Sequence, residues 1–452
     1  MAKKKGKELT LEEKLEQALV PREDWPYEVP ENWCWTYMKN VARWGSGGTP
    51  SRKHSEYYNG TIPWIKTGEL NNQYIYDTEE KITEEAIRKS SAKIFPQNSV
   101  IIAMYGATIG KVGILGIPAT TNQACACAES SIAIYYKYLF FYALSQREVF
   151  IAEGKGGAQP NISQNVIKNH RIPLPPLPEQ QRIVECIENL YAKLDEAKEM
   201  VQAVLDESEK RKAAILHKAF SGELTEKWRN ENKLLLDEWK QLSVKEVCTS
   251  LKYGTSAKSK DKGKAIVIRM GNLQKGEIDW SKLAYTDNEE EIEKYKLSSG
   301  DVLFNRTNSP ELVGKTAIYR GEYPAIYAGY LIKLDYKRDI LIGEYLNYIL
   351  NSPVAKEYCN SVKTDGVNQS NINAQKIGAF VIPVPNKKEQ EEIVSTLDNI
   401  FAKEKVILET AEKSLEHIDS IKKSILAKAF RGELGTNDLS EPTSMELLKE
   451  IL

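Results

Sequence analysis

The chain has 452 residues, more than the roughly 250 to 300 that one hydrophobic core organises, so two to four domains are expected. Charged residues make up 28% and hydrophobic residues 41%, a balance typical of folded globular proteins and not of disordered chains. The formal net charge of −1 excludes a nucleic-acid binder that relies on overall basic charge, so any such affinity must come from local patches or from partners.

The first ten residues, MAKKKGKELT, are basic, but no apolar run follows them, and no stretch of about 18 apolar residues occurs in the chain. We therefore expect a cytoplasmic protein. The six cysteines are scattered and are expected to be reduced thiols.

In chain order, a basic helical extension (residues 1–20) precedes a first globular head (residues 21–175). Short β-branched and aromatic runs bounded by Gly, Asn and Pro, such as IPWIKTGEL (62–70), predict strands of a mixed α/β domain in this head. A long helix is predicted next, within residues 176–224, with Pro178 in its first turn and Gly222 as its C-terminal cap. At about 40 residues it would be about 60 Å long.

Apolar or small residues recur along this helix in steps of three and four, the a/d pattern of a coiled-coil seam. They are Ile183, Ile187, Leu190, Leu194, Ala197, Val201 and Val204.

A second head (residues 235–385), a second long helix (386–434) and a C-terminal tail (435–452) follow. An ungapped shift of 210 residues relates the two copies, from Gln159 and Gln369 to ILHKAFSGEL and ILAKAFRGEL. The second helix keeps much of the seam, although Glu404 interrupts it, with Leu397, Ile400, Ile407, Ala411, Leu415, Ile418, Ile421 and Ile425. We expect the two helices to pair as an antiparallel coiled coil. The alternative is that each packs on its own head.

The heads are related more loosely than the helices. IPWIKTGEL matches IVIRMGNL (266–273), and SVIIAMYGATIGKVGI (99–114) matches DVLFNRTNSPELVGKTAI (301–318) after a two-residue insertion. The fold class predicted is therefore α+β, with an internal pseudo-two-fold repeat of two mixed α/β heads and two long helices. The helices are interpreted as a shared scaffold, and the heads as two versions of a reader.

Signatures of enzymes are scarce. The chain contains no Gly-x-Gly-x-x-Gly, no Walker loop and neither an Asn-Pro-Pro-Tyr nor an Asp-Pro-Pro-Tyr methyltransferase motif. EGK (153–155) has only the end of a nuclease-like pattern, the four histidines are far apart, and CAC (125–127) has no second ligand pair at zinc spacing. No catalytic or metal-binding residue is predicted.

Loops rich in Lys, Arg, Asn, Gln, Ser and Thr recur at matching places in both heads, and such side chains bind base edges and phosphates. Each loop alone is also compatible with ordinary turn chemistry. The candidates in the first head are Thr49, Ser51, Arg52, Lys53, Lys66, Thr67, Tyr105, Thr108, Lys111, Asn122 and Gln123. In the second head they are Thr255, Ser256, Lys258, Lys260, Arg269, Asn272, Asn305, Arg306, Thr307, Asn308 and Lys315.

From about Trp25 to Leu434 the chain resembles the specificity subunits of type I DNA restriction-modification complexes. The motifs that carry the resemblance are WPYEVPENWCW (25–35), GGAQPNI (156–162) with GVNQSNI (366–372), PLPEQQRIV with PNKKEQEEIV, and the two KAF-x-GEL endings. The second copy departs from the family pattern at Asn386-Lys387-Lys388, which puts the start of that helix in doubt.

The resemblance implies a non-catalytic reader of double-stranded DNA, in which two target-recognition domains each bind half of a split, asymmetric sequence. It also implies partners: methylase subunits, two per chain, that carry S-adenosylmethionine, and restriction subunits that use ATP and Mg. The chain itself would hold no cofactor. Two other interpretations remain open, a coiled-coil scaffold with protein-binding heads and a fused single-chain modification enzyme.

Overall fold

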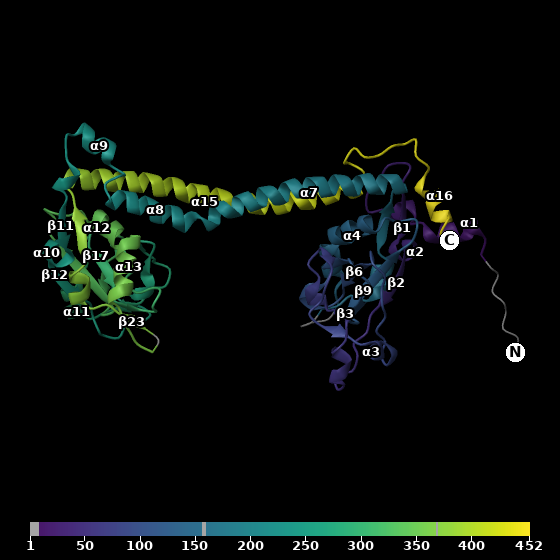
Figure 1. The fold of residues 1–452 in the computed structure, drawn as a ribbon, viewed down its shortest axis with the longest axis horizontal. Helices are drawn as coiled ribbons and strands as arrows, with labels where there is room; N and C mark the ends of the chain where they lie inside the picture. Colours follow the sequence, from purple (N-terminus) through teal and green to yellow (C-terminus); the bar gives the residue numbers. More distant parts are fainter. Residues whose placement is uncertain (1–8, 156–159, 368) are drawn as a thin grey trace. The chain divides into compact units, whose positions relative to one another are not determined.

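The computed structural model describes residues 9–155, 160–367 and 369–452, which divide between two compact units (Figure 1). Unit 1 comprises Met1–Met200 and Ser414–Leu452, and unit 2 comprises Val201–Lys413. Each unit therefore contains one head and a part of both helical segments; we call residues 21–175 head 1 and residues 235–385 head 2. The basic residues 1–8, the Gly156–Gln159 part of GGAQPNI and Asn368 of GVNQSNI lie outside the described residues.

Head 1 is built on a five-stranded sheet of order β2-β9-β6-β7-β4. These strands are β2 (Ala42–Ser46), β9 (Cys125–Ser130), β6 (Val100–Ala103), β7 (Val112–Leu115) and β4 (Tyr74–Ile75). Every residue of β6 and β7 is buried, as expected for strands covered on both faces. A second sheet has β5 (Lys81–Ile82), β3 (Ile62–Ile65) and β8 (Thr120–Thr121), and β1 (Cys34–Tyr37) pairs with β10 (Arg171–Leu174).

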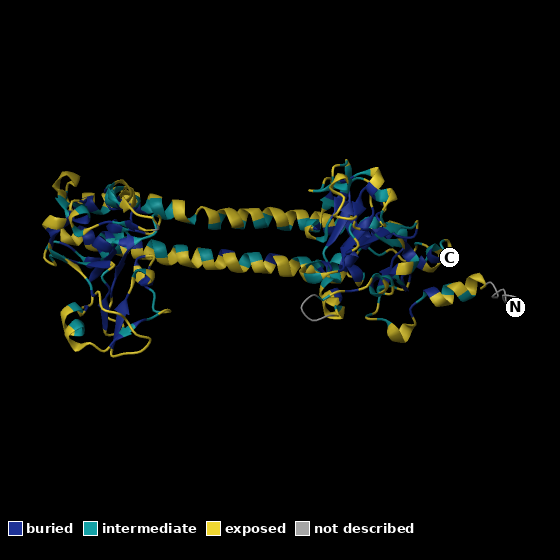
Figure 2. Cartoon of the chain, turned by 90° about the horizontal axis from the view of Figure 1, so that it is seen from below, coloured by how far each residue is buried: buried dark blue, intermediate teal, exposed yellow. Residues whose placement is uncertain are grey.

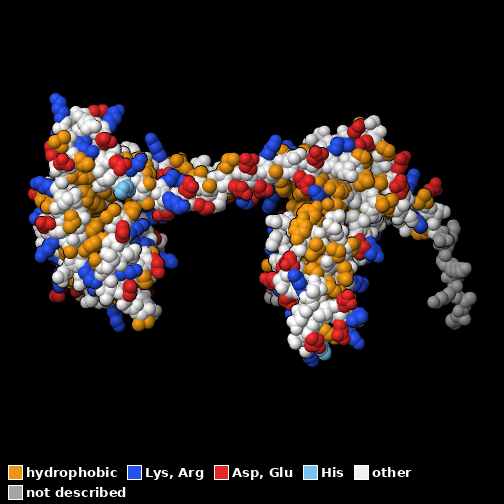
Figure 3. Space-filling model, viewed as in Figure 1, with side chains coloured by type: hydrophobic (Ala, Val, Ile, Leu, Met, Phe, Trp, Pro, Cys, Tyr) orange, Lys and Arg blue, Asp and Glu red, His pale blue; other side chains and the backbone are white. Residues whose placement is uncertain are grey.

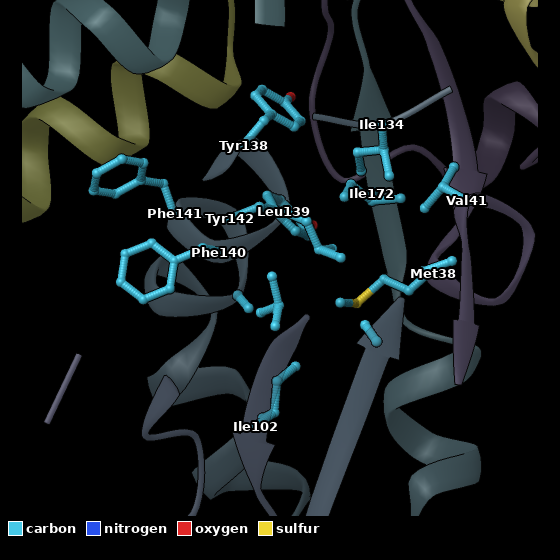
Figure 4. Packing of buried hydrophobic residues seen from close by; sticks show 14 of the residues in the cluster. Met38, Val41, Ile102, Ile134, Tyr138, Leu139, Phe140, Phe141, Tyr142 and Ile172 are labelled. Carbon is cyan, nitrogen blue, oxygen red and sulfur yellow. The ribbon is translucent and has the colours of Figure 1, made fainter. Parts of the chain in front are cut away.

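The core of head 1 forms between its sheet and α4 (Tyr136–Ser145), which buries six consecutive residues from Tyr138 to Ala143 (Figure 4). The rings of Tyr138 and Tyr142 meet the ring of Phe430 edge to face, with centroids 5.3 and 5.0 Å apart. Phe430 is the phenylalanine of the second KAF-x-GEL ending, so that motif completes this core. The other helices of head 1 are α2 (Met38–Val41), α3 (Glu84–Arg88), α5 (Arg147–Glu153) and α6 (Gln164–Lys168).

Head 2 repeats this plan with a sheet of order β12-β21-β17-β19. Its strands are β12 (Cys248–Tyr253), β21 (Leu331–Tyr336), β17 (Val302–Asn305) and β19 (Thr316–Ile318). The second sheet has β16 (Tyr285–Thr286), β13 (Ala265–Ile268) and β20 (Ala325–Tyr327), and β11 (Lys240–Ser243) pairs with β24 (Val381–Val384). Head 2 adds β14 (Leu273–Gln274) paired with β15 (Glu277–Ile278), and a small sheet of β18 (Thr307–Asn308), β23 (Ser370–Asn371) and β22 (Thr364–Asp365). Its helices are α10 (Val244–Val247), α11 (Glu289–Tyr295), α12 (Gly343–Leu350), α13 (Pro353–Val362) and α14 (Ala374–Gly378).

The first helical segment differs from the single helix predicted, because it is divided at Glu207 into α7 (Leu177–Asp206) and α8 (Ser208–Phe220). Arg211 Nη2 donates a hydrogen bond of 2.7 Å to the Val204 carbonyl, an acceptor that an unbroken helix would use internally. The second helix, α15 (Lys387–Phe430), is continuous over 44 residues, so the departure at Asn386-Lys387-Lys388 does not prevent its start there.

The long helices contact each other within each unit, and the contacts run antiparallel. In unit 1, Tyr191 Oη donates to the Lys422 carbonyl at 3.0 Å, and Lys198 pairs with Asp419 at 3.4 Å. In unit 2, Arg211 Nη2 lies 2.7 Å from Glu404 Oε1. The seam position that Glu404 interrupts in the sequence is thus filled by an ion pair.

Burial along the helices follows most of the predicted seam (Figure 2). Ile183, Ile187, Leu397 and Ile418 are buried, whereas Leu190, Leu194, Val201, Ile400, Leu415 and Ile425 are half-buried. The prediction was wrong for Ile407, whose side chain is 47% exposed, and for Ile421, which is 46% exposed. Leu408 is the half-buried residue at the first of these turns, because steps of four and three from Glu404 reach Leu408 and then buried Ala411.

The predicted C-terminal tail contains a helix, α16 (Ser444–Lys449), that belongs to unit 1. Leu448 joins the head 1 core, and Lys14 Nζ, from α1 (Leu11–Ala18), donates to the Leu452 carbonyl at 2.8 Å. Over the residues that the structure describes, no helix has the length and apolarity needed to cross a membrane.

Candidate DNA interface

Both heads are joined to the long helices by the same buried contact. Trp33 Nε1 donates to Glu179 Oε2 at 2.7 Å in unit 1, and Trp239 Nε1 donates to Glu389 Oε2 at 2.9 Å in unit 2. Burial raises the pKa of Glu179, whereas the hydrogen bonds from Trp33 and Asn437 lower it. The glutamates of the two repeated Glu-Gln motifs therefore attach each head to a long helix. We call these two contacts, Trp33–Glu179 and Trp239–Glu389, the joints.

The glutamines of these motifs lock the loop before each helix. Gln180 Nε2 donates to the Ala133 and Pro175 carbonyls, both at 3.0 Å, and Gln390 Nε2 donates to the Ile340 and Pro385 carbonyls at 2.9 and 2.8 Å. Each glutamine thus satisfies two backbone carbonyls near the start of its helix. This shared requirement explains why the motif is repeated.

The glycines of the KAF-x-GEL endings cap their helices as predicted, with φ of +84° at Gly222 and +74° at Gly432. A Cβ atom would lie 2.4 Å from Leu236 Cδ1 at Gly222 and 2.5 Å from Pro30 Cγ at Gly432. The repeated phrase therefore packs and caps, and the structure places it in the joints.

Two cations predicted in head 1 are neutralised by acids of the same head. Arg52 binds Glu80 through two hydrogen bonds of 2.6 and 3.2 Å and stacks 4.0 Å from the Tyr58 ring centroid. Lys66 pairs with Glu79 at 2.9 Å and with Glu80 at 3.1 Å. The hydrogen bond from Arg52 lowers the pKa of Glu80, so this carboxylate stays charged. This part of head 1 has little net attraction for phosphate.

A second group of head 1 candidates lies at the ends of β6 and β9. Tyr105 is 44% exposed, accepts Thr108 Oγ1 at its carbonyl at 2.7 Å, and bridges to Asn161. Thr49 and Gln123 are hydrogen-bonded to each other. The structure therefore brings Tyr105 and Thr108 together in one loop, and it joins Thr49 and Gln123 from two other loops. Of the remaining candidates, Ser51 and Lys53 are exposed, and Thr67, Lys111 and Asn122 are half-buried.

In head 2, three segments meet around one arginine. The Arg306 guanidinium lies 4.8 Å from the Tyr253 ring centroid, and its Nη1 donates to the Gly329 carbonyl at 3.3 Å. Tyr253 is 42% exposed and neighbouring Tyr330 is 51% exposed. We call Tyr253, Arg306, Gly329 and Tyr330 the Arg306 cluster. A cation held against an aromatic ring at the surface is preorganised to bind an acceptor.

Four of the predicted DNA-binding residues are buried: Thr255, Asn272, Asn305 and Thr307. Asn272 accepts the Arg269 amide and donates to the Asp279 and Lys282 carbonyls, and Asn305 accepts the Thr307 amide. These four side chains support the loops of head 2 from within, so burial removes them from the residues expected to touch DNA.

The other head 2 candidates are spread over the surface. Lys260 pairs with Asp287 at 3.3 Å, Lys315 Nζ donates to Gln274 Oε1 at 3.1 Å, and Asn308 accepts the Ser309 amide at 2.9 Å. Ser256, Lys258 and Arg269 are exposed. The predicted DNA-binding residues did not include Tyr253 and Tyr330. The sequence signal that could have indicated them is an aromatic residue next to a glycine, in YGTS and AGY.

The two heads differ at matched positions. The Arg306 amide donates to the Tyr330 carbonyl at 3.0 Å, and the Met104 amide donates to the Ala124 carbonyl at 2.9 Å, so Arg306 and Met104 occupy equivalent places. Met104 is 4% exposed and apolar. Head 1 therefore has no cation at the point where head 2 places its arginine.

Reactive groups are not assembled in the described part of the chain. There, no three His, Cys, Asp or Glu residues are grouped so that they could hold a metal ion. Burial raises the pKa of the Cys34 thiol to about 11 and that of Cys127 to about 12, which keeps both protonated at neutral pH. On the face seen in Figure 3, acidic and basic side chains are interspersed along the long helices.

Repeated joints combined with heads that differ at their surfaces define a duplicated recognition protein, and comparison with known proteins identifies its family. The model of the type I restriction modification DNA specificity domain matches residues 30–204 and again residues 236–417. The chain belongs to this family. It is the DNA specificity subunit of a type I restriction-modification system and has no catalytic activity of its own.

Relatives of similar length support the assignment. The chain is 28% identical to the type I restriction enzyme EcoKI specificity subunit of Escherichia coli K12 over 421 residues, 90% of each chain. It is 24% identical to the MjaVIII specificity subunit of Methanocaldococcus jannaschii over 91% of this chain and 95% of that one. The crystal structure of the HsdS subunit from Thermoanaerobacter tengcongensis has the same fold, with a TM-score of 0.60, 19% identity, and coverage of 90% of this chain and 99% of that one.

Proposed function

We propose that the two heads, residues 21–175 and 235–385, are target-recognition domains that each read one half of a split, asymmetric DNA sequence. The observation that carries this proposal is the replacement of Met104 by Arg306 at one structural position. At this position the arginine of head 2 can bind a base edge, whereas the buried methionine of head 1 cannot, so the two heads read their half-sites differently.

In head 2, the Arg306 cluster is the base-reading element. The guanidinium leaves donors on Nη2 after Nη1 has bound Gly329, and the exposed ring of Tyr253 lies against it. Arginine is the side chain that most often recognises guanine, through O6 and N7 in the major groove. The half-site of head 2 therefore contains a G·C pair.

The long helices act as one antiparallel coiled-coil spacer that fixes the gap between the half-sites. The repeated joints and helices offer the same surface twice, which suits two methylase subunits per chain. Those subunits supply S-adenosylmethionine for adenine methylation, and restriction subunits supply ATP and Mg-dependent cleavage. A protein that acts on chromosomal DNA in this way works in the cytoplasm.

The test is a gel shift of the chain with its methylase subunits, after methylated adenines in the host genome have been mapped to name the motif. At moderate salt the complex is expected to bind a duplex with that motif at least a hundredfold more tightly than a scrambled duplex, since specificity ratios of about 10³ or more are usual. Equal binding of both duplexes would contradict the proposal and favour the scaffold interpretation. Methylation by the chain alone would instead favour a fused modification enzyme.

A further inference from the structure

A basic cavity of about 430 Å³ lies in unit 2 between α8 and the body of head 2. Residues of α8, of the β14–β15 turn, of the 311–315 loop and of α13 line it. Four lysines are part of this lining: Lys212, Lys275, Lys315 and Lys356. We call it the lysine cavity.

None of these four ammonium groups has an acidic partner within the described chain. Lys212, Lys275 and Lys356 form none of the ion pairs found there, and Lys315 is hydrogen-bonded only to the neutral amide of Gln274. Lys212 is half-buried, with its Nζ 5.5 Å from the Phe401 ring centroid. Burial lowers the pKa of Lys212; the Glu209 carboxylate raises it, and the ammonium groups of Lys356 and Lys275 lower it again. Like charges therefore converge here without neutralisation.

Two glutamates also line the lysine cavity, but they leave it positive. Hydrogen bonds from its own backbone amide and from Ser309 lower the pKa of Glu311, so it stays charged, but the four lysines of the lining outnumber the two glutamates. Glu209 is exposed and makes no ion pair with Lys212. The charge that remains is that of an anion-binding site.

The internal repeat shows why Lys212 has no partner. Its counterpart 210 residues on is Lys422, which lies 4.9 Å from the Tyr191 ring centroid, as Lys212 lies near Phe401. Lys422, however, is paired with Asp195. The residue that corresponds to Asp195 in the other copy is Lys405, so the acid has been replaced by a further cation. The same helix contact is neutral in unit 1 and positive in unit 2.

We propose that the lysine cavity binds a phosphate group of the DNA backbone beside the half-site of head 2. This inference rests on the proposed function. The loop that lines the cavity, Glu311 to Lys315, continues directly from Arg306, Thr307 and Asn308, so one loop connects the base-reading element to the cavity. Lysine binds phosphate as a mobile point charge, and a near-neutral protein depends on such local clusters for its attraction to DNA. An acidic segment of a partner protein is the competing occupant.

The experiment measures the affinity of the methylase complex for target and scrambled duplexes over a series of salt concentrations. Lys212→Met keeps an aliphatic stem against Phe401, and Lys356→Gln removes a second charge. Each phosphate contact contributes about 0.9 to the slope of log K against log salt. We expect the double variant to lower that slope by about 1, because the cavity holds one phosphate group, and each single variant to lower it by less, with target and scrambled DNA weakened alike.

Lys422→Gln is the matched control, because its lysine is already paired with Asp195 and should leave the slope unchanged. Co-purification of the methylase subunits with each variant gives an independent readout. An unchanged slope in the double variant overturns the inference, and lost methylase capture with that slope would assign the cavity to an acidic protein partner. The unmodified complex, measured in the same series, tests the proposed function separately by its preference for the target duplex.

Discussion

His170 is a half-buried histidine that is held neutral. Its Nε2 lies 3.3 Å from Gln146 Oε1, and its ring lies 4.9 Å from the ring of Phe150. Burial, together with the nearby Arg171 charge, lowers its pKa to about 4. In the second copy the same position is Phe380, which is buried.

Replacing His170 with phenylalanine should make head 1 less sensitive to acid. The unfolded chain binds a proton at His170 below pH 6.5, whereas the folded chain does so only near pH 4, so folding stability falls as pH drops through this window. We expect the melting temperature of the unmodified chain to fall between pH 7 and pH 5 by several degrees more than that of His170→Phe. The matched variant Phe380→His should steepen the fall; equal pH profiles for all three would contradict this account.

At this scale the sequence predicted chemistry better than exposure. Asn305 and Asn272 were not recognised as buried, whereas Arg306, predicted alongside them, is half-buried against the Tyr253 ring. Whether an asparagine faces solvent or satisfies loop carbonyls depends on where the backbone turns, and propensity alone does not determine this. The lysine cavity was missed for a similar reason, since Lys212, Lys275 and Lys356 come from three separate elements.

The helical elements are held by one polar contact at their break as well as by apolar packing. Arg211 donates to Glu404 through Nε at 3.0 Å and through Nη2 at 2.7 Å, and to the Val204 carbonyl. The Arg211 side chain is 33% exposed and the Glu404 side chain is 16% exposed. Half-buried charged groups cost free energy when they lose their partners.

We therefore expect Glu404→Leu to lower the free energy of unfolding by about 1 to 3 kcal/mol, because it leaves the Arg211 guanidinium without its acid. The double variant Arg211→Leu/Glu404→Leu should recover most of that loss, since two leucines restore an apolar seam. Urea denaturation monitored by helical circular dichroism measures both. A double variant less stable than the single one would show that the ion pair itself stabilises the helices.

The long helices could be predicted because their apolar spacing and their repeat agree over many turns. The break at Glu207 could not be predicted, since it depends on Arg211 donating hydrogen bonds to both the Val204 carbonyl and the Glu404 carboxylate. Helix α16 escaped prediction because it is short and is stabilised by Leu448 entering the core of head 1.

If each head reads one half of the target, a mutation in one head should change only that half of the methylation motif. Arg306→Ala should relax or change bases in one half of the motif only, and Tyr105→Ala should affect only the other half, with the gap unchanged. Sequencing of methylated adenines in cells that carry each variant measures this. If either variant altered both halves, the heads would not act as independent readers.

The 210-residue repeat predicted the duplication. The segments that make up each unit, however, are not the consecutive domains that were predicted. Each unit combines its head with the start of one helix and the end of the other. The contacts that produce this arrangement involve the glutamates of the joints. Glu179 binds Asn437, and Glu389 binds Arg229, and both partners follow the end of the opposite helix. Hydrophobic periodicity does not report such long-range contacts.

This division of the chain also sets an order for folding during synthesis. Unit 2 is one continuous stretch, so its core can close while the ribosome is still translating the final residues. Head 1 emerges first, but its core includes Leu426, Phe430 and Leu448, which are made last. The domain that is synthesised first must therefore wait for the carboxyl end of its own chain, and a truncated product would release a finished second reader beside an unfinished first one.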